Sequence, residues 1–279
     1  MTKDNTAVNT AREYYNSFDA DTFYYTVWGG EDLHVGTFRK PEEDIFTASR
    51  RTVKNLASLA KPITEKTKVL DMGSGIGGSA RYLAKTHGCR VTAFNLSEVE
   101  NDRNKKMNKE QSLDHLIDVK EGNFENINFD DETFDIVWSQ DAILHSGNRE
   151  KVLAEALRVL KKGGEMIFTD PMQTEDCYEE YLDPILQRIL LESLATPEFY
   201  CKTAEQLGMK VHRYVNQPQC LVNHYAKVLE DTKTKEDELI KQGVSKTYIQ
   251  NMKKGLEHWV IGGKYGHLTW GMFHFEKQA

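Results

Sequence analysis

The stretch VLDMGSGIGG, residues 69–78, decides the fold of this chain. Its first three residues are typical of a buried strand, and the glycines predict a tight turn into a helix over 79–87 that ends at Gly88. Glycine has no Cβ, so the main chain of such a turn can approach a ligand closely, and the helix behind it presents free N–H groups. We therefore expect a ligand to bind where this strand ends.

Short β-rich runs alternate with helical patterns around this stretch. An amphipathic helical pattern covers 149–162, before a Gly-Gly stop, and the β-rich runs lie at 69–71, 90–94, 117–119, 134–138 and 166–168. This alternation predicts an α/β fold with a mostly parallel sheet covered by helices. Two later runs, 210–215 and 269–276, predict two further strands.

One elaborated domain is the simplest organisation for 279 residues. Residues 1–60, rich in Tyr and Trp and helical over 42–60, are expected to form a helical cover over the carboxyl edge of the sheet. The core would span 61–216 and include helices at 178–195 and 197–207. Residues 217–279 would then form a helical insertion followed by the final strand of the same domain.

Composition excludes several classes of function. A formal charge of −7 and a pI near 5.8 disfavour nucleic acid and anionic membranes as partners. The four cysteines are scattered without CxxC pairs, so neither a metal site nor a disulfide framework is expected. No apolar run is long enough to span a membrane, and the polar start lacks a secretory signal, so we expect a cytoplasmic protein.

The glycine stretch differs from a dinucleotide-binding site. Such a site has the pattern G-x-G-x-x-G and an acid about 20 residues further on that binds a ribose hydroxyl. Here the pattern is D-x-G-x-G-x-G-G, with Asp71 before the glycines and Asn95 at the end of the second strand. A nicotinamide-dependent oxidoreductase is therefore disfavoured.

This variant resembles the first motif of class I S-adenosylmethionine-dependent methyltransferases. The resemblance implies a Rossmann-like sheet of seven strands, the last one antiparallel, and S-adenosylmethionine as the methyl donor. Asn95 and Asn123 stand where the family commonly has acids, although an amide can still bond both ribose hydroxyls. The donor-binding residues that the resemblance implies are Asp71, Gly73, Ser74, Gly75, Gly77, Asn95, Asn101, Asn123, Phe124 and Gln140.

His145 ends the stretch WSQDAILH, residues 138–145, which follows the fourth strand. Taken alone, such a histidine is more often packed in the core. The stretch is similar, however, to one in small-amine N-methyltransferases such as the phosphoethanolamine enzymes, where the matching histidine helps to close and assemble the active site. The resemblance implies a tyrosine partner near the N-terminus, which by register is Tyr15, with Tyr14 as the nearest rival.

Longer stretches outside the sheet resemble sarcosine/dimethylglycine N-methyltransferases, which make the osmoprotectant glycine betaine by successive methylation. They are YYNS at 14–17, VWGGEDLHVG at 27–36, TDPM at 169–172, KKGLEHW at 253–259 and LTWG at 268–271. A methylated glycine carries a carboxylate and an amine that becomes permanently cationic, so its site needs a basic anchor and aromatic faces. Arg188 is the expected anchor, and the other expected substrate contacts are Trp28, Tyr25, Asp141, Met172, Tyr225 and Trp270.

The expected mechanism is direct in-line displacement at the sulfonium methyl group, with positioning and dehydration supplying most of the catalysis. His145 or bulk water could take the proton of the acceptor nitrogen. Tyr15 would rather lock a lid, because its ordinary pKa of about 10 is far from neutrality. Three alternatives stay open, namely a phosphoethanolamine-type enzyme, a glycine N-methyltransferase and a donor-binding regulatory module without catalysis. The protein is expected to be a monomer or a weak homo-oligomer.

Overall fold

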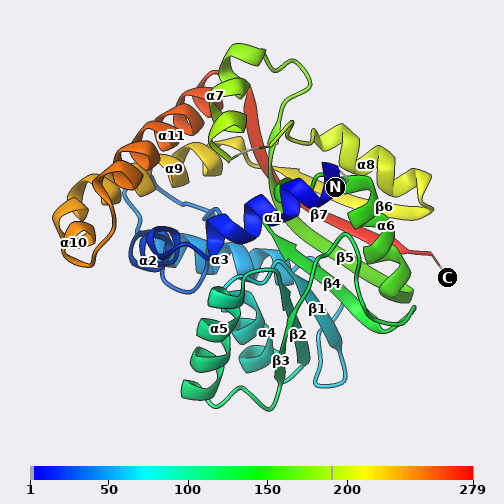
Figure 1. Cartoon of the computed structure of the whole chain (residues 1–279). Coiled ribbons are helices and arrows are strands. Elements are labelled where there is room, and N and C mark those ends of the chain that lie inside the picture. Colours follow the sequence, from blue (N-terminus) through cyan, green and yellow to red (C-terminus); the bar gives the residue numbers. More distant parts are fainter. Residues whose placement is uncertain (1–2, 190, 279) are drawn as a thin grey trace.

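The computed structural model describes residues 3–189 and 191–278. Their strands form one seven-stranded sheet, in which β7 is antiparallel to both of its neighbours and the pairs from β3 to β5 are parallel (Figure 1). The order of the sheet is β3 (Ile117–Glu121), β2 (Arg90–Asn95), β1 (Lys68–Met72), β4 (Phe134–Gln140), β5 (Leu160–Gln173), β7 (Leu268–Lys277) and β6 (Met209–Asn216). The expected Rossmann-like fold class is confirmed.

Both faces of the sheet are buried, because successive residues of its strands enter two different cores. Ile136 and Trp138 of β4 pack in one cluster, whereas Val137 packs in the other. The first core includes residues of α3 (Ile45–Ala57) and α4 (Gly78–His87), and the second includes residues of α6 (Arg149–Val159) and α8 (Pro197–Gln206). Strands buried on both faces explain the nearly continuous apolar runs in the sequence.

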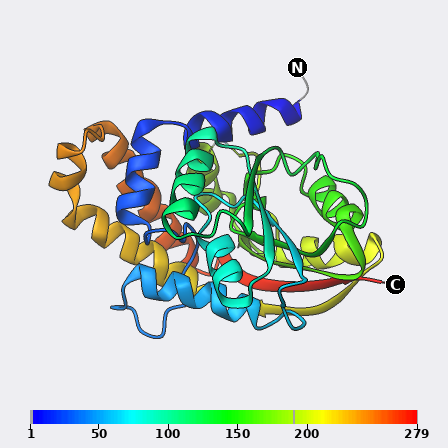
Figure 2. The same cartoon turned by 90° about the horizontal axis from the view of Figure 1, so that it is seen from below.

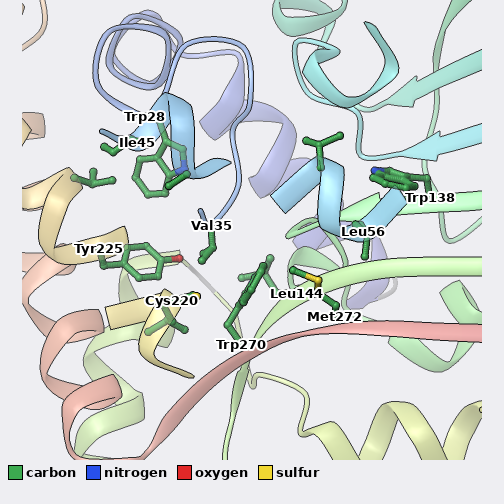
Figure 3. Packing of buried hydrophobic residues seen from close by; sticks show 14 of the residues in the cluster. Trp28, Val35, Ile45, Leu56, Trp138, Leu144, Cys220, Tyr225, Trp270 and Met272 are labelled. Carbon is green, nitrogen blue, oxygen red and sulfur yellow. The ribbon is translucent and has the colours of Figure 1, made fainter. Parts of the chain in front are cut away.

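A layer of helices lies beyond the carboxyl ends of the central strands (Figures 1 and 2). It is made of α1 (Lys3–Tyr15), α2 (Phe18–Val27), α7 (Glu179–Ile189), α9 (Pro218–Thr234), α10 (Glu236–Lys241) and α11 (Lys246–Lys264). The helix α11 packs against both α9 and α7, and α10 contacts α2. Figure 3 shows Trp28, Tyr225 and Trp270 in the buried cluster that joins this layer to the sheet.

Two details of the sheet differ from the expectation. The helix expected over 149–162 ends at Val159, and β5 begins at Leu160. Gly163 and Gly164 lie inside that strand, where Phe134 pairs with Leu160 and Ile136 pairs with Glu165. The two glycines therefore form a bulge in β5 and do not end the helix. Gly163 adopts a φ of +72° at this bulge.

Within residues 3–189 and 191–278, no helix combines the length and apolar character that crossing a membrane requires.

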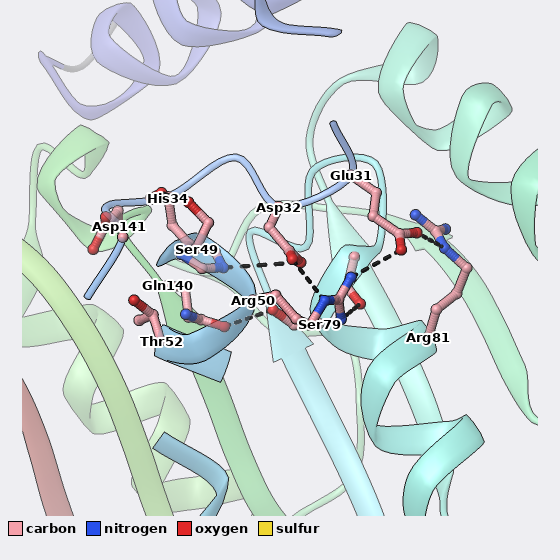
Figure 4. A network of polar contacts seen from close by, with 12 residues as sticks. Glu31, Asp32, His34, Ser49, Arg50, Thr52, Ser79, Arg81, Gln140 and Asp141 are labelled. Atoms are coloured by element: carbon pink, nitrogen blue, oxygen red, sulfur yellow. Dashed lines mark hydrogen bonds and ion pairs between the residues drawn. The ribbon is translucent and has the colours of Figure 1, made fainter. Parts of the chain in front are cut away.

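Charged side chains fasten the segment between α2 and α3 to the core (Figure 4). The carboxylate of Glu31 accepts hydrogen bonds from Arg50 at 2.8 Å and from Arg81 at 2.6 Å, while Asp32 lies 2.9 Å from Nε of Arg50. Arg81 is only 1% exposed. A Cβ on Gly78 would lie 2.0 Å from the carbonyl oxygen of Glu31, so this close approach of two main-chain segments requires a glycine at the start of α4.

The Glu31→Gln substitution should lower the free energy of unfolding by about 1–3 kcal/mol, because the buried Arg81 guanidinium loses a charged acceptor. Urea unfolding followed by circular dichroism measures the change. The matched control is Asp102→Asn, which breaks the exposed ion pair with Lys105 and should have no measurable effect. Equal effects of the two substitutions would contradict a structural role for Glu31.

Candidate active site

Two adjoining cavities open where β1, β2 and β4 end. The glycine-loop cavity, of about 790 Å³, is lined by Gly73, Gly75, Asn95, Asn123 and Phe124 among others. The arginine cavity, of about 740 Å³, is lined by Arg188 and several aromatic residues. The two share a boundary formed by Ala11, Tyr15, Tyr24, Leu33, Asp141 and His145. This position, beyond the carboxyl ends of parallel strands, is where open α/β sheets bind their ligands.

Main chain forms one wall of the glycine-loop cavity. Gly73 and Gly75 adopt positive φ angles of +69° and +50°, a conformation that favours glycine. A Cβ on Gly73 would lie 2.3 Å from the Cβ of Ala142, so a side chain there would clash with the segment after β4. The local sequence thus fixes this wall, as the glycine pattern predicts.

Several residues expected to bind the donor lie behind that wall and do not line the cavity. Asp71 is buried, and burial raises its pKa to about 7. Ser74 is also outside the lining, and Gly77 caps α4 with its Cα hydrogen facing Asn104. Asn101 donates a hydrogen bond to the carbonyl oxygen of Asn95. Their positions suit support of the loop better than direct contact.

An acid that the sequence reasoning missed lies beside Asn95. Nδ2 of Asn95 donates to a carboxylate oxygen of Glu100 at 2.9 Å, and Glu100 lines the glycine-loop cavity. Burial raises the pKa of Glu100 to about 7. The spacing of Ser97 and Glu100 is that of a capping box, and Ser97 does cap α5 (Glu98–Glu110), but this local signal does not say that the carboxylate faces a cavity.

The amide of Gln140 gives the same cavity a free hydrogen-bond donor. Its Oε1 accepts from the Ser79 hydroxyl at 2.5 Å (Figure 4). The same oxygen accepts from the Trp138 indole at 3.0 Å. Its buried Nε2 has no hydrogen-bond partner among the described residues. A buried donor without a partner is costly, so this N–H group is suited to a ligand.

Tyr15 and His145 join the helical layer to the sheet at the boundary of the two cavities. The Tyr15 hydroxyl, on α1, lies 2.9 Å from Nε2 of His145, on the short helix η1 (Ile143–His145). Burial lowers the pKa of His145 to about 4 and raises that of Tyr15 well above 10. Both side chains are therefore neutral at pH 7. The rival residue, Tyr14, instead lies 3.0 Å from the hydroxyl of Tyr248.

Asp141 is the one acidic residue among the described residues that line the arginine cavity. It accepts hydrogen bonds from the main-chain N–H of Val35, the hydroxyl of Thr169 and the indole of Trp270, at 2.7, 2.6 and 2.8 Å. Its backbone has a φ of +51°, which is uncommon for a residue with a side chain. Burial raises the pKa of this carboxyl group.

Arg188 lines the arginine cavity and has no acidic partner among the described residues. Its hydrogen bond is to the sulfur of Met252, at 3.0 Å, and its Nε is buried with no partner. A cation held in this way leaves most of its donors available, and a carboxylate is the ligand that matches them best.

The aromatic lining differs partly from the expectation. Trp28 and Tyr225 line the arginine cavity as expected. Tyr25 does not, because it is 48% exposed and its ring lies under the guanidinium of Arg103, and Met172 is buried in the second core. Trp270 also lies outside the lining and instead supports Asp141. Sequence reasoning missed three rings of this lining, those of Tyr24, His34 and Trp259.

Comparison with known proteins identifies the family. Residues 70–168 match the family model described as "Methyltransferase domain". The chain is 54% identical to a sarcosine/dimethylglycine N-methyltransferase of Halorhodospira halochloris, over 98% of each protein. It is 48% identical to an enzyme of the same name from Aphanothece halophytica, over 99% of this chain and 100% of the relative.

A solved structure extends the match to three dimensions. A putative sarcosine dimethylglycine methyltransferase from Galdieria sulphuraria superposes with a TM-score of 0.89 at 39% identity, covering 95% of this chain and 99% of that one. The resemblance read from the motifs is thereby confirmed over nearly the whole length. The chain belongs to the family of sarcosine/dimethylglycine N-methyltransferases.

Proposed function

We propose that this protein transfers methyl groups from S-adenosylmethionine to the nitrogen of sarcosine and then of dimethylglycine, forming glycine betaine. One observation carries the proposal. The arginine cavity holds one guanidinium, Arg188, and one carboxylate, Asp141, with the rings of Trp28, Tyr24 and Tyr225 in its wall. An N-methylated glycine has the complementary pattern of a carboxylate and a cationic or developing cationic nitrogen.

The glycine-loop cavity is the donor site. Glu100 and Asn95 offer a carboxylate and an amide for ribose hydroxyls, Phe124 offers a ring for the adenine, and Nε2 of Gln140 is a donor that lacks a partner. The bare main chain of Gly73 and Gly75 leaves room for the methionine part. When bound, the donor supplies a methyl group made electrophilic by the sulfonium.

On the acceptor side, Arg188 binds the substrate carboxylate and Asp141 faces the nitrogen. The three hydrogen bonds that hold Asp141 keep its carboxylate from swinging away, so it can stabilise positive charge that develops on the nitrogen as the methyl group arrives. The aromatic rings add faces that attract a methylated cation. A phosphate group carries more charge than the single guanidinium can match, which favours a carboxylate acceptor over phosphoethanolamine.

The acceptor nitrogen must be deprotonated before it attacks, and bulk water takes this proton before the site closes. A histidine whose pKa is about 4 holds a proton weakly, so His145 is poorly matched to the role of general base near pH 7. Its hydrogen bond to Tyr15 fits another role, which is to hold α1 over the boundary and exclude water from the reacting groups. Both cavities are lined by residues of this chain, so we propose that one protomer can bind the donor and the acceptor together.

Purified protein with labelled S-adenosylmethionine should methylate sarcosine and dimethylglycine, and should leave phosphoethanolamine unmodified. Mass spectrometry of the products identifies the acceptor. Glycine is included because a glycine N-methyltransferase differs only in its first acceptor. Incorporation into phosphoethanolamine alone would overturn the assignment of the acceptor and leave the fold and the donor unaffected.

Donor-site affinity should depend on pH through Glu100. Because its pKa in the free protein is about 7, the carboxylate that accepts hydroxyl hydrogen bonds predominates only above that pH. Binding of S-adenosylhomocysteine should therefore weaken as the pH falls, by up to about tenfold per pH unit below about pH 7. Calorimetric titration at several pH values measures this dependence.

In Glu100→Gln this pH dependence should disappear, with affinity at high pH about tenfold weaker because a charged acceptor is lost. The control, Glu110→Gln, changes an exposed glutamate of the same helix and should bind like the wild type. A Glu100→Gln variant that keeps the wild-type pH profile would remove Glu100 from the donor site.

His145→Ala should lower turnover about tenfold or more and change donor affinity much less, because Tyr15 and His145 border the donor cavity only where it meets the arginine cavity and close the site there. Tyr15→Phe, which removes only the hydroxyl, should cause a similar loss, and the double variant should lose little more. Initial rates and calorimetry separate the two effects. His115→Ala, at an exposed histidine, is the control, and unchanged turnover in His145→Ala would exclude His145 from the catalytic machinery.

A further inference from the structure

Arg188 lies between two hollows of the molecule. Besides the arginine cavity, its side chain lines an outer hollow of about 970 Å³ between α7 and α11, together with Gln187, Asn251 and Lys254. These three residues are exposed, so the outer hollow opens to solvent. A long, flexible arginine at such a partition can face either side. The contacts that fix this side chain therefore decide how the guanidinium is presented to the arginine cavity.

Gly255 is the residue against which Arg188 lies. A Cβ on Gly255 would come within 2.1 Å of Cδ and 2.3 Å of Nε of Arg188. Separations this short are not tolerated, so an alanine here would force the arginine to move. The side chain of Arg188 therefore occupies the space that the missing Cβ leaves on the surface of α11.

The helix itself gives no reason for a glycine at this position. Gly255 is buried in the interior of α11, where glycine is less favourable than alanine by about 1 kcal/mol. Its φ is not among the positive values found in this chain, so the backbone conformation does not require glycine either. The contact with Arg188 is the feature that a larger residue would disturb.

The other contacts of the guanidinium are weak. Met252, three residues earlier on the same helix, accepts one hydrogen bond through its sulfur, and thioether sulfur is a poor acceptor. No described carboxylate pairs with Arg188, so no ion pair fixes its direction. The shape of α11 at Met252 and Gly255 is what holds the side chain in place.

We propose that Gly255 is a positioning residue, which lets the Arg188 guanidinium lie across α11 and face the arginine cavity, and which thereby sets the affinity for the acceptor carboxylate. The inference deepens the proposed function and rests on it, because it takes Arg188 as the carboxylate anchor. Gly255 does not line the arginine cavity and acts only through Arg188.

The Gly255→Ala variant tests this proposal. The KM for sarcosine and for dimethylglycine should rise about tenfold or more, as expected when a charge-assisted contact is lost, while the donor dissociation constant stays unchanged. The melting temperature should change little, because the better helix propensity of alanine offsets the cost of moving the arginine. A loss of affinity for the donor as well as for the acceptors would overturn the proposal, because the effect would then not be confined to Arg188.

A double-mutant cycle with Arg188→Met supplies the matched control. Gly255→Ala should add no further increase in KM when the guanidinium is already absent. An unchanged acceptor KM in Gly255→Ala, or an equal increase in the Arg188→Met background, would show that Gly255 does not act through Arg188.

Activity assays of the wild-type protein test the proposed function separately. If the wild type methylates neither sarcosine nor dimethylglycine, the acceptor assignment is wrong. A crystal structure of Gly255→Ala then still tests the positioning role, because it locates the guanidinium without any substrate. A guanidinium found in its original place would refute that role.

Discussion

The carboxylate of Asp141 is the point at which distant parts of the chain meet. Its three hydrogen-bond donors come from the segment after α2, from β5 and from β7, while Asp141 itself follows β4. The positive φ of Asp141 costs free energy, of the order of 1–2 kcal/mol, that these contacts offset. Because Asp141 borders both cavities, the same contacts that join the segments also fix the boundary between them.

The N-terminal helices complete the site and do not merely cover it. Tyr15 of α1, Tyr24 of α2 and Leu33 of the following segment all border both cavities. The core sheet alone would leave these cavities open to water. The charged contacts of Glu31 and Asp32 to the arginines of α3 and α4 hold this segment against the glycine loop (Figure 4). The contacts that hold the N-terminal segment closed therefore also shape the site.

The unpaired cation at the arginine cavity lowers stability but favours binding of an anionic ligand. Burying a guanidinium without an anion is unfavourable, because the group loses water and gains no equal partner. Arg188 is partly buried, its Nε has no hydrogen-bond partner among the described residues, and its guanidinium donates to a thioether sulfur, which is a poor acceptor. A ligand carboxylate removes this penalty, so the unmatched cation favours binding of an anion. Such local inconsistency between sequence and environment is expected at functional sites.

The sequence by itself determined the features that depend on neighbouring residues. The turn at Gly73 and Gly75 needs positive φ angles, which is a local requirement, and the strands could be found from their apolar runs. The pairing of Tyr15 with His145 was also found, although only through resemblance, since 130 positions separate the two residues.

Only the tertiary structure decided which side chains face the cavities. Tyr24, and not Tyr25, lines the site, because one step along a helix turns the side chain by about 100°. Glu100 supplies the acid that the end of β2 lacks, and Gly255 makes room for an arginine 67 residues away. These relations arise when α5 packs beside β2 and α11 packs beside α7. No short stretch of sequence encodes how such distant elements pack or which way their side chains then face.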